Sequence, residues 1–132
     1  MLRAVSSSSR EYWLRCAGDS SKDGLLDAEL DGKVRGADVG LLYHPGRRGE
    51  AEVCARWKES LAALASDIRV RRNYPYAGKG DGLTTHLRLR FAQSDYVGIE
   101  LEVNQSIVLA AGRRWTTLRR KLIDSLQTAC AA

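Results

Sequence analysis

Two carboxylates and an amide alternate along one strand-like segment late in the chain. Residues 96–104 read YVGIELEVN, and successive side chains of a β-strand point to opposite faces. Glu100, Glu102 and Asn104 would therefore share one face. A carboxylate at the end of a strand can take a proton from water and return it to a leaving amine. Glu102 is thus a candidate general base and acid, although the same alternation is typical of a strand whose polar face is in water.

A turn-rich segment, NYPYAGKGDG, precedes this strand at residues 73–82. Its glycines allow backbone to approach a ligand closely, but it lacks the GK[ST] sequence of a phosphate-binding P-loop. Guanidinium groups nearby have the fork geometry that suits carboxylates, and they belong to Arg69, Arg71, Arg72, Arg88 and Arg90. No RNP, KH or zinc-finger pattern accompanies them, so a solvated basic face is the alternative and nucleic acid is an unlikely partner.

The histidines and cysteines do not form a metal-binding pattern. Neither His44 nor His86 has an HxxH or HxxE partner, and a zinc site needs several converging ligands. The three cysteines are widely spaced and never arranged as CxxC, which indicates reduced thiols in a cytoplasmic protein. Cys54 and Cys130 fall in predicted helices, where we expect them to be buried as small hydrophobic residues.

The elements that must position these groups follow from hydrophobic spacing. The apolar run 39–43 before Pro45 predicts a buried strand, and 68–74 alternates as a second strand. Residues 49–66 form a helix with an apolar stripe, and Asp81 can cap a short helix carrying Leu83, Leu87 and Phe91. A last helix spans about 112–129, with its stripe on Trp115, Leu118, Leu122 and Leu126. This strand–helix order predicts an α/β protein with at least some parallel strands.

Residues 1–33 give little periodic signal. Tyr12, Trp13 and Leu14 would anchor a helical turn, 18–24 reads as a loop, and 25–30 as a short helix or strand. The Ser- and Arg-rich start lacks the apolar core of a secretory signal, so a disordered or frayed terminus is expected.

Length, charge and hydropathy limit the number of domains and the kinds of partner that we expect. A chain of 132 residues fits one domain. The net charge of +5 favours anionic partners. No apolar run approaches the roughly 20 residues of a spanning helix, so no membrane association is expected.

Four segments resemble the C-terminal part of the N-formylglutamate amidohydrolase family. They are DGKVRGADVGLLYHP, GEAEVCARW, VRRNYPYAGKGDGLTTHLR and YVGIELEVNQ. The family is similar to the zinc carboxypeptidase and aspartoacylase group. The resemblance therefore implies a three-layer α/β fold, with helices flanking a small, mostly parallel or mixed sheet. It also implies hydrolysis of a linear amide, a formyl or related acyl group on an acidic amino acid, by water activated on zinc.

Carried over to this sequence, the resemblance makes Glu102 the general base and acid. It assigns the substrate pocket to Arg72, Asn73, Tyr74, Tyr76 and Asn104, with Arg72 pairing with a substrate carboxylate. Family members carry metal-binding histidines upstream of the match, whereas no histidine precedes His44 here. The expectation is that 31–132 are the C-terminal part of an amidohydrolase-like domain, that 1–30 are a divergent or truncated segment, and that the metal ligands are absent from this chain.

Two functions remain open. The first is a cytoplasmic, metal-dependent amidohydrolase for a small anionic amide, present as a C-terminal portion. The second is a non-catalytic, degenerate domain that binds an anionic partner through its basic face. A truncated α/β domain would expose a sheet edge or core surface, so a homo-oligomer or association with a missing N-terminal half is also expected.

Overall fold

The computed structural model describes most of the chain from residue 36 onward. The described ranges there are 36–74, 76–80, 82–110 and 112–131. Upstream of them it describes the backbone of four strands, which are β1 (Leu2–Val5), β2 (Glu11–Cys16), β3 (Glu29–Leu30) and β4 (Lys33–Val34).

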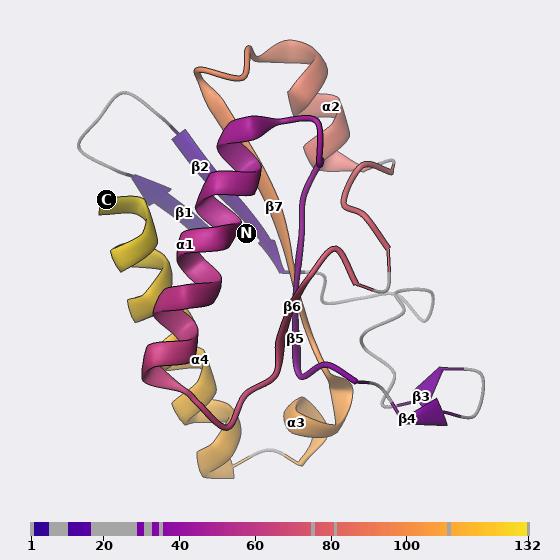
Figure 1. The fold of residues 1–132 in the computed structure, drawn as a ribbon, viewed down its shortest axis with the longest axis vertical. Coiled ribbons are helices and arrows are strands. Elements are labelled where there is room, and N and C mark those ends of the chain that lie inside the picture. Colours follow the sequence, from indigo (N-terminus) through magenta and orange to yellow (C-terminus); the bar gives the residue numbers. More distant parts are fainter. Residues whose placement is uncertain are drawn as a thin grey trace.

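One mixed sheet of five strands forms the centre of the molecule, in the order β1-β2-β7-β5-β6 (Figure 1). Its C-terminal strands are β5 (Val39–Leu42), β6 (Val70–Arg72) and β7 (Tyr96–Val103). The longest strand, β7, pairs parallel with β2 and antiparallel with β5, while β5 and β6 are parallel. Strands β3 and β4 form a separate antiparallel pair. The predicted α/β fold with a mixed sheet flanked by helices is confirmed.

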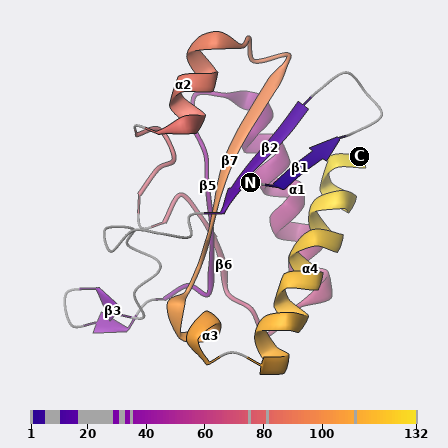
Figure 2. The ribbon, with the colours of Figure 1, turned by 180° about the vertical axis from the view of Figure 1, so that it is seen from behind.

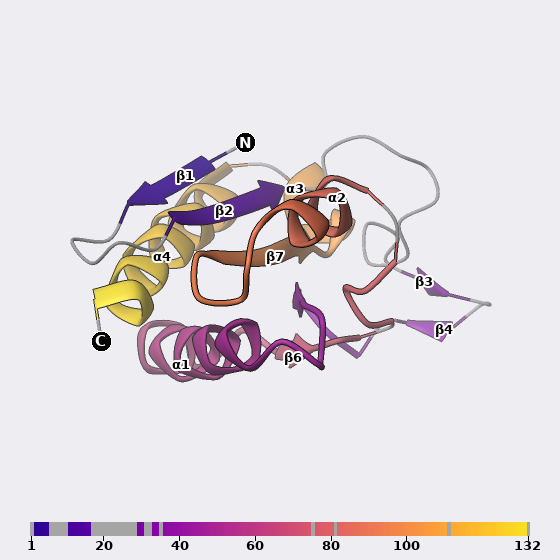
Figure 3. The same cartoon turned by 90° about the horizontal axis from the view of Figure 1, so that it is seen from above.

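Helices cover both faces of this sheet. The two long helices, α1 (Arg48–Leu64) and α4 (Gly112–Ala131), pack together on one face. The short helix α2 (Leu83–Arg90) lies against β7 on the other face, as Figures 2 and 3 show. A five-residue helix, α3 (Gln105–Leu109), joins β7 to α4. The strands thus present one side to a pair of helices and the other side to α2 and the loop that precedes it.

The core lies between the sheet and the α1–α4 pair. Alternate residues of β7 enter it, as do the predicted stripes of both long helices; its members include Val97, Ile99, Leu101, Val103, Val53, Trp57, Leu61, Leu118 and Leu122. Trp57 is fully buried, and its indole Nε1 donates a 3.0 Å hydrogen bond to Ser125 Oγ on α4. This bond satisfies the only polar atom of the ring, so the tryptophan can bridge the helices without a desolvation penalty.

Several sequence predictions differ from the structure. The strand predicted at 68–74 is limited to β6, because Asn73 takes a positive φ of 47° that turns the chain away from the sheet. The helical turn predicted at Tyr12–Leu14 is wrong, since these residues belong to β2. The short helix predicted to carry Leu83, Leu87 and Phe91 ends at Arg90, so Phe91 lies just beyond it, and both Leu83 and Phe91 are exposed. The predicted Asp81 cap and the loop at 18–24 lie outside the described residues.

The N-terminal segment also differs in part from the expectation. Residues of β1 and β2 form ordered strand backbone at one side of the sheet, with β2 in register against β7 from Glu11 to Cys16. The frayed terminus predicted there is wrong for these two strands. The rest of 1–30, apart from β3, lies outside the described residues.

Candidate functional site

The face of the sheet opposite the core carries the acidic residues of β7. Because Ile99, Leu101 and Val103 enter the core, Glu100 and Glu102 must point to the α2 side. This face was expected to lie in water if the strand were an ordinary half-exposed one. That expectation is wrong for Glu102, whose exposed fraction is 1%. Glu100 is half-buried and accepts a 2.8 Å hydrogen bond from Thr84 Oγ1 on α2.

Glu102 lies against the turn-rich loop, as the hydrolase interpretation requires. The Tyr76 hydroxyl donates a 2.6 Å hydrogen bond to Glu102 Oε1. The carboxylate is buried, whereas the tyrosine is 41% exposed. Short bonds between a hydroxyl and a charged oxygen are among the stronger hydrogen bonds in proteins. Tyr76 therefore connects a buried acid to the molecular surface.

Asn73 and Gly78 hold this loop against the sheet. Asn73 Oδ1 accepts hydrogen bonds from the backbone N–H groups of Tyr43 (2.9 Å) and Gly78 (3.2 Å). A Cβ at Gly78 would lie 2.5 Å from Leu42 C and Tyr43 N, so only glycine permits this approach. Asn73 was predicted to contact substrate; its side-chain oxygen instead fastens the loop that carries Tyr76.

An arginine shares the row of Glu102 across the sheet. Gly40 of β5 pairs with Glu102 of β7 on one side and with Arg71 of β6 on the other. Residues in register on adjacent strands point to the same face, so Arg71 and Glu102 face the same side, and the position between them in the row, Gly40, has no side chain. The Arg71 guanidinium lies 4.4 Å from the ring centroid of Tyr74, a cation–π arrangement that orients it.

Arg72, the predicted carboxylate-binding residue, is directed elsewhere. It pairs with Leu41, a core residue, so it belongs to the α1 face. Burial raises the pKa of the Cys54 thiol in α1, and the charge of Arg72 opposes that rise. Arg72 therefore lies near α1, on the core side of the sheet. Sequence reasoning noted both arginines but lacked the strand register that separates them. The structure therefore places two pairs on the same face of the sheet, Tyr76 with Glu102 and Tyr74 with Arg71, and it places Arg72 on the opposite face.

The five arginines that were expected to form one basic face are dispersed. Arg88 is buried in ion pairs, and Arg69 is held by Asp38 with bonds of 3.0 and 3.1 Å. Arg71 and Arg72 lie on opposite sides of the sheet. Burial raises the pKa of Asp38, but the hydrogen bonds and charge of Arg69 outweigh it, so the net pKa is lowered.

Asn104, another predicted substrate contact, caps a helix. Its Oδ1 accepts hydrogen bonds from Ser106 N (3.0 Å) and Ser106 Oγ (2.8 Å), and its Nδ2 donates to Ala37 O (3.3 Å). Asparagine at this position satisfies a free N–H of the first turn of α3. The side chain is buried, and these contacts account for its place at the end of β7.

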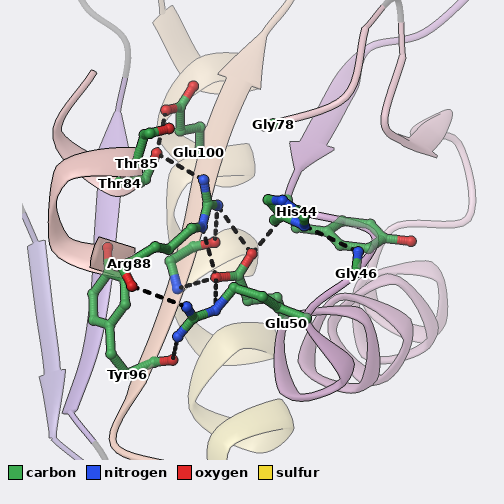
Figure 4. A network of polar contacts seen from close by, with 12 residues as sticks. His44, Gly46, Glu50, Gly78, Thr84, Thr85, Arg88, Tyr96 and Glu100 are labelled. Carbon is green, nitrogen blue, oxygen red and sulfur yellow. Dashed lines mark hydrogen bonds and ion pairs between the residues drawn. The ribbon is translucent and has the colours of Figure 1, made fainter. Parts of the chain in front are cut away.

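A second acid, Glu50, forms a buried polar network that the sequence analysis did not identify (Figure 4). Its carboxylate accepts hydrogen bonds from Arg88 Nε and Nη2, both at 2.9 Å, and from the backbone of His44 and Gly98 at 2.8 and 3.2 Å. Arg47 Nε lies 3.2 Å away. This network connects α1, α2 and β7, so it holds in place the helix whose Thr84 contacts Glu100.

The described residues do not supply a metal centre. No group of three or more His, Cys, Asp or Glu side chains is arranged to hold a metal in the part of the chain that the structure describes. His44 Nδ1 accepts a 3.0 Å hydrogen bond from Gly46 N, and His86 is exposed on α2. Cys54 and Cys130 are free and buried as predicted, and burial raises the pKa of both thiols.

Comparisons with known proteins assign no family to the chain. No family model and no curated protein matches the chain. The crystal structure of gene product Atu2144 from Agrobacterium tumefaciens matches with a TM-score of 0.49 and 20% identity. The match covers 78% of this chain and 38% of that chain, so this chain corresponds to well under half of that protein. None of the described helices combines the length and apolar character needed to span a bilayer.

Proposed function

We propose that this chain carries the acid–base and substrate-binding part of a hydrolase similar to N-formylglutamate amidohydrolase. The substrate would be a linear amide that joins a formyl or related acyl group to an acidic amino acid. One observation carries the proposal: Glu102 is buried beside Tyr76 on the sheet face that Arg71 shares. The mixed sheet between helices supports the further proposal that this is part of a zinc-carboxypeptidase-like fold.

The row of residues Arg71, Gly40 and Glu102 across the sheet suits a small dianionic amide. Adjacent strands are about 4.8 Å apart, so positions 71 and 102, two strands apart, are separated by roughly 10 Å. Arg71 can pair with a substrate carboxylate in a bidentate manner. The amide of such a substrate would then lie towards Glu102. We therefore assign to Arg71 the carboxylate-binding role first expected of Arg72.

Glu102 would move the proton in this reaction. Its carboxylate takes a proton from water as the water oxygen bonds to the acyl carbon, and it returns that proton to the amine as the C–N bond breaks. The Tyr76 hydroxyl, which donates to Oε1, holds the carboxylate in one orientation. Zinc is implied by the resemblance alone. The described residues do not fit a metal site.

Formate release from N-formyl-L-glutamate, with zinc supplied, tests the proposed reaction. Glu102→Gln keeps the shape of the side chain and is expected to lower the rate by a factor of about 100 or more. Glu100→Gln is the matched control, because Glu100 lies two residues away on the same face but binds Thr84. It should retain most activity. Turnover that survives Glu102→Gln, or no turnover by the unmodified protein, would contradict the proposal.

Calorimetric titration with the same compound separates the two arginines. Arg71→Ala is expected to weaken binding about tenfold or more, whereas Arg72→Ala should leave it almost unchanged, because only Arg71 shares the face of Glu102. The opposite result would return the carboxylate-binding role to Arg72.

The second candidate is a non-catalytic domain that binds an anionic partner. A specific observation favours it: the first half of α4 carries exposed arginines for which the described residues supply no ion pair. This surface is different from the basic face expected from the sequence.

A further inference from the structure

The first half of α4 has the highest net positive charge of any stretch of its length in the described chain. From Gly112 to Leu122 it contains no acid and five cations, which are Arg113, Arg114, Arg119, Arg120 and Lys121. None of them forms a salt bridge with any residue that the structure describes. Three arginines around the sheet behave differently, since Arg47, Arg69 and Arg88 are each paired with a carboxylate.

Helical geometry gathers these cations on the outside of the molecule. Leu118 and Leu122 turn the inner side of α4 towards the core. Arg113 and Arg120 are seven residues apart, which is about two turns or roughly 10 Å along one side. Thr117 lies between them on the same side and, like both arginines, is exposed. Figure 1 shows that this half of α4 forms the lower end of the molecule, next to α3.

The position of the charges is unfavourable for the isolated protein. A helix N-terminus behaves as about half a positive charge, so it repels cations in the first turn. Arg113 and Arg114 both occupy the first turn of α4, which contains no acid; of the two, Arg114 is near enough to Asp38 to feel its charge. A bound polyanion would relieve this repulsion.

We propose that the first half of α4 binds the phosphate backbone of duplex nucleic acid. Phosphates are contacted mainly by arginine and lysine, by hydroxyl side chains and by helix N-termini, and all three are present here. The surface lacks the apolar face that a membrane-bound helix inserts, because the stripe of α4 is buried against the sheet and α1. Of the exposed large apolar residues, α4 carries only Ile123 among those described. Binding would not depend on base sequence, and it stands independently of the hydrolase proposal.

Fluorescence anisotropy with a labelled duplex DNA of about 20 base pairs tests this surface. Arg113→Glu/Arg120→Glu reverses two charges on the outer side of α4. The matched control is Lys58→Glu/Arg90→Glu, which reverses two exposed cations on α1 and α2. Both variants change the net charge from +5 to +1, so they differ only in where the charge is altered. Circular dichroism and thermal melting check that both remain folded.

The unmodified protein should bind the duplex in 50 mM salt and lose affinity steeply by 200 mM. Each phosphate contact adds about 0.9 to the slope of log affinity against log salt. The α4 variant should therefore bind about tenfold more weakly at 50 mM, with a slope smaller by about two. The control should lose less than about threefold.

Three results would overturn the proposal. They are no binding by the unmodified protein at 50 mM salt, equal weakening of both variants, and binding to vesicles with anionic lipid or to poly-glutamate that matches or exceeds binding to the duplex. The last result would assign the surface to a lipid or an acidic protein.

Discussion

Replacing Glu50 with leucine is expected to destabilise the protein by about 3 to 5 kcal/mol, because removing one member of a buried ion pair leaves its partner charged and without compensation. Glu50 is 1% exposed and the Arg88 side chain 6%. The variant would remove both bonds that Arg88 donates to the carboxylate. It would also leave the buried N–H of Gly98 without its acceptor.

The expected loss is large relative to the total free energy of unfolding. Domains of this kind are stable by about 5 to 15 kcal/mol, so Glu50→Leu should remove a substantial part of the stability. Adding Arg88→Met should recover part of the loss, since the second change removes the uncompensated charge and fills its place with an apolar chain. The non-additivity of the two changes measures the coupling between the side chains.

Urea unfolding followed by circular dichroism gives each free energy from the midpoint and slope. Arg48→Ala is the control, because Arg48 pairs with Glu52 on the same helix at 2.6 Å but is 90% exposed. An exposed pair of this kind contributes less than about 1 kcal/mol. If Glu50→Leu lowers the free energy of unfolding no more than Arg48→Ala does, the Glu50 network does not stabilise the fold and the reasoning is refuted.

Three further changes test individual features. Asp38 has a pKa held below its ordinary 3.8 by Arg69, so its stabilisation is present above that value and is lost as the pH falls through the lower folded pKa. Unfolding free energies of the unmodified protein and Asp38→Asn should therefore differ at pH 7 and converge in acid. Burial raises the pKa of Tyr96 from 10.0 to about 12, so the folded state keeps a proton that the unfolded state loses. This group should lower the unfolding free energy by about 2 to 3 kcal/mol as the pH rises from 10.0 to about 12. Because the buried thiols of Cys54 and Cys130 add a loss of their own, Tyr96→Phe should reduce the alkaline loss by that amount, measured in urea titrations, without abolishing it. Gly78→Ala should displace the loop and accelerate tryptic cleavage at Lys79, whereas Gly80→Ala should not, because a Cβ at Gly80 meets nothing within 4 Å.

Elements with continuous hydrophobic periodicity could be predicted from the sequence. The stripes of α1 and α4, the apolar run of β5 and the alternation of β7 all correspond to observed elements. Strand β2 could not be predicted in this way, because its strand state reflects pairing with β7, more than eighty residues later in the chain. The end of β6 depends on the positive φ of Asn73, which the alternating pattern does not report.

The polar contacts around the candidate site were harder to predict, because they join residues far apart in sequence. Glu50 lies in the first turn of α1, where an acid favours the start of a helix. It also stands three residues before Val53, on the apolar stripe of α1, and an acid on a buried stripe is a signal of a buried partner. That partner, Arg88, is 38 residues away on a helix whose orientation the sequence does not specify. The sequence could not separate Arg71 from Arg72 for a similar reason, since only strand register assigns them to opposite faces.

The two buried acids differ in what their surroundings allow. Glu50 is enclosed by α1, α2 and β7 and bound by two N–H groups of Arg88, so its charge is compensated inside the fold. A group held in this way stabilises the packing but is screened from a substrate. Glu102 is equally buried, yet it contacts Tyr76, whose ring reaches the surface on a loop fastened by Asn73 and Gly78. Movement of this loop would admit water to the carboxylate without opening the core. Proton transfer requires that access, and for this reason Glu102 is the better candidate for chemistry and Glu50 for structure.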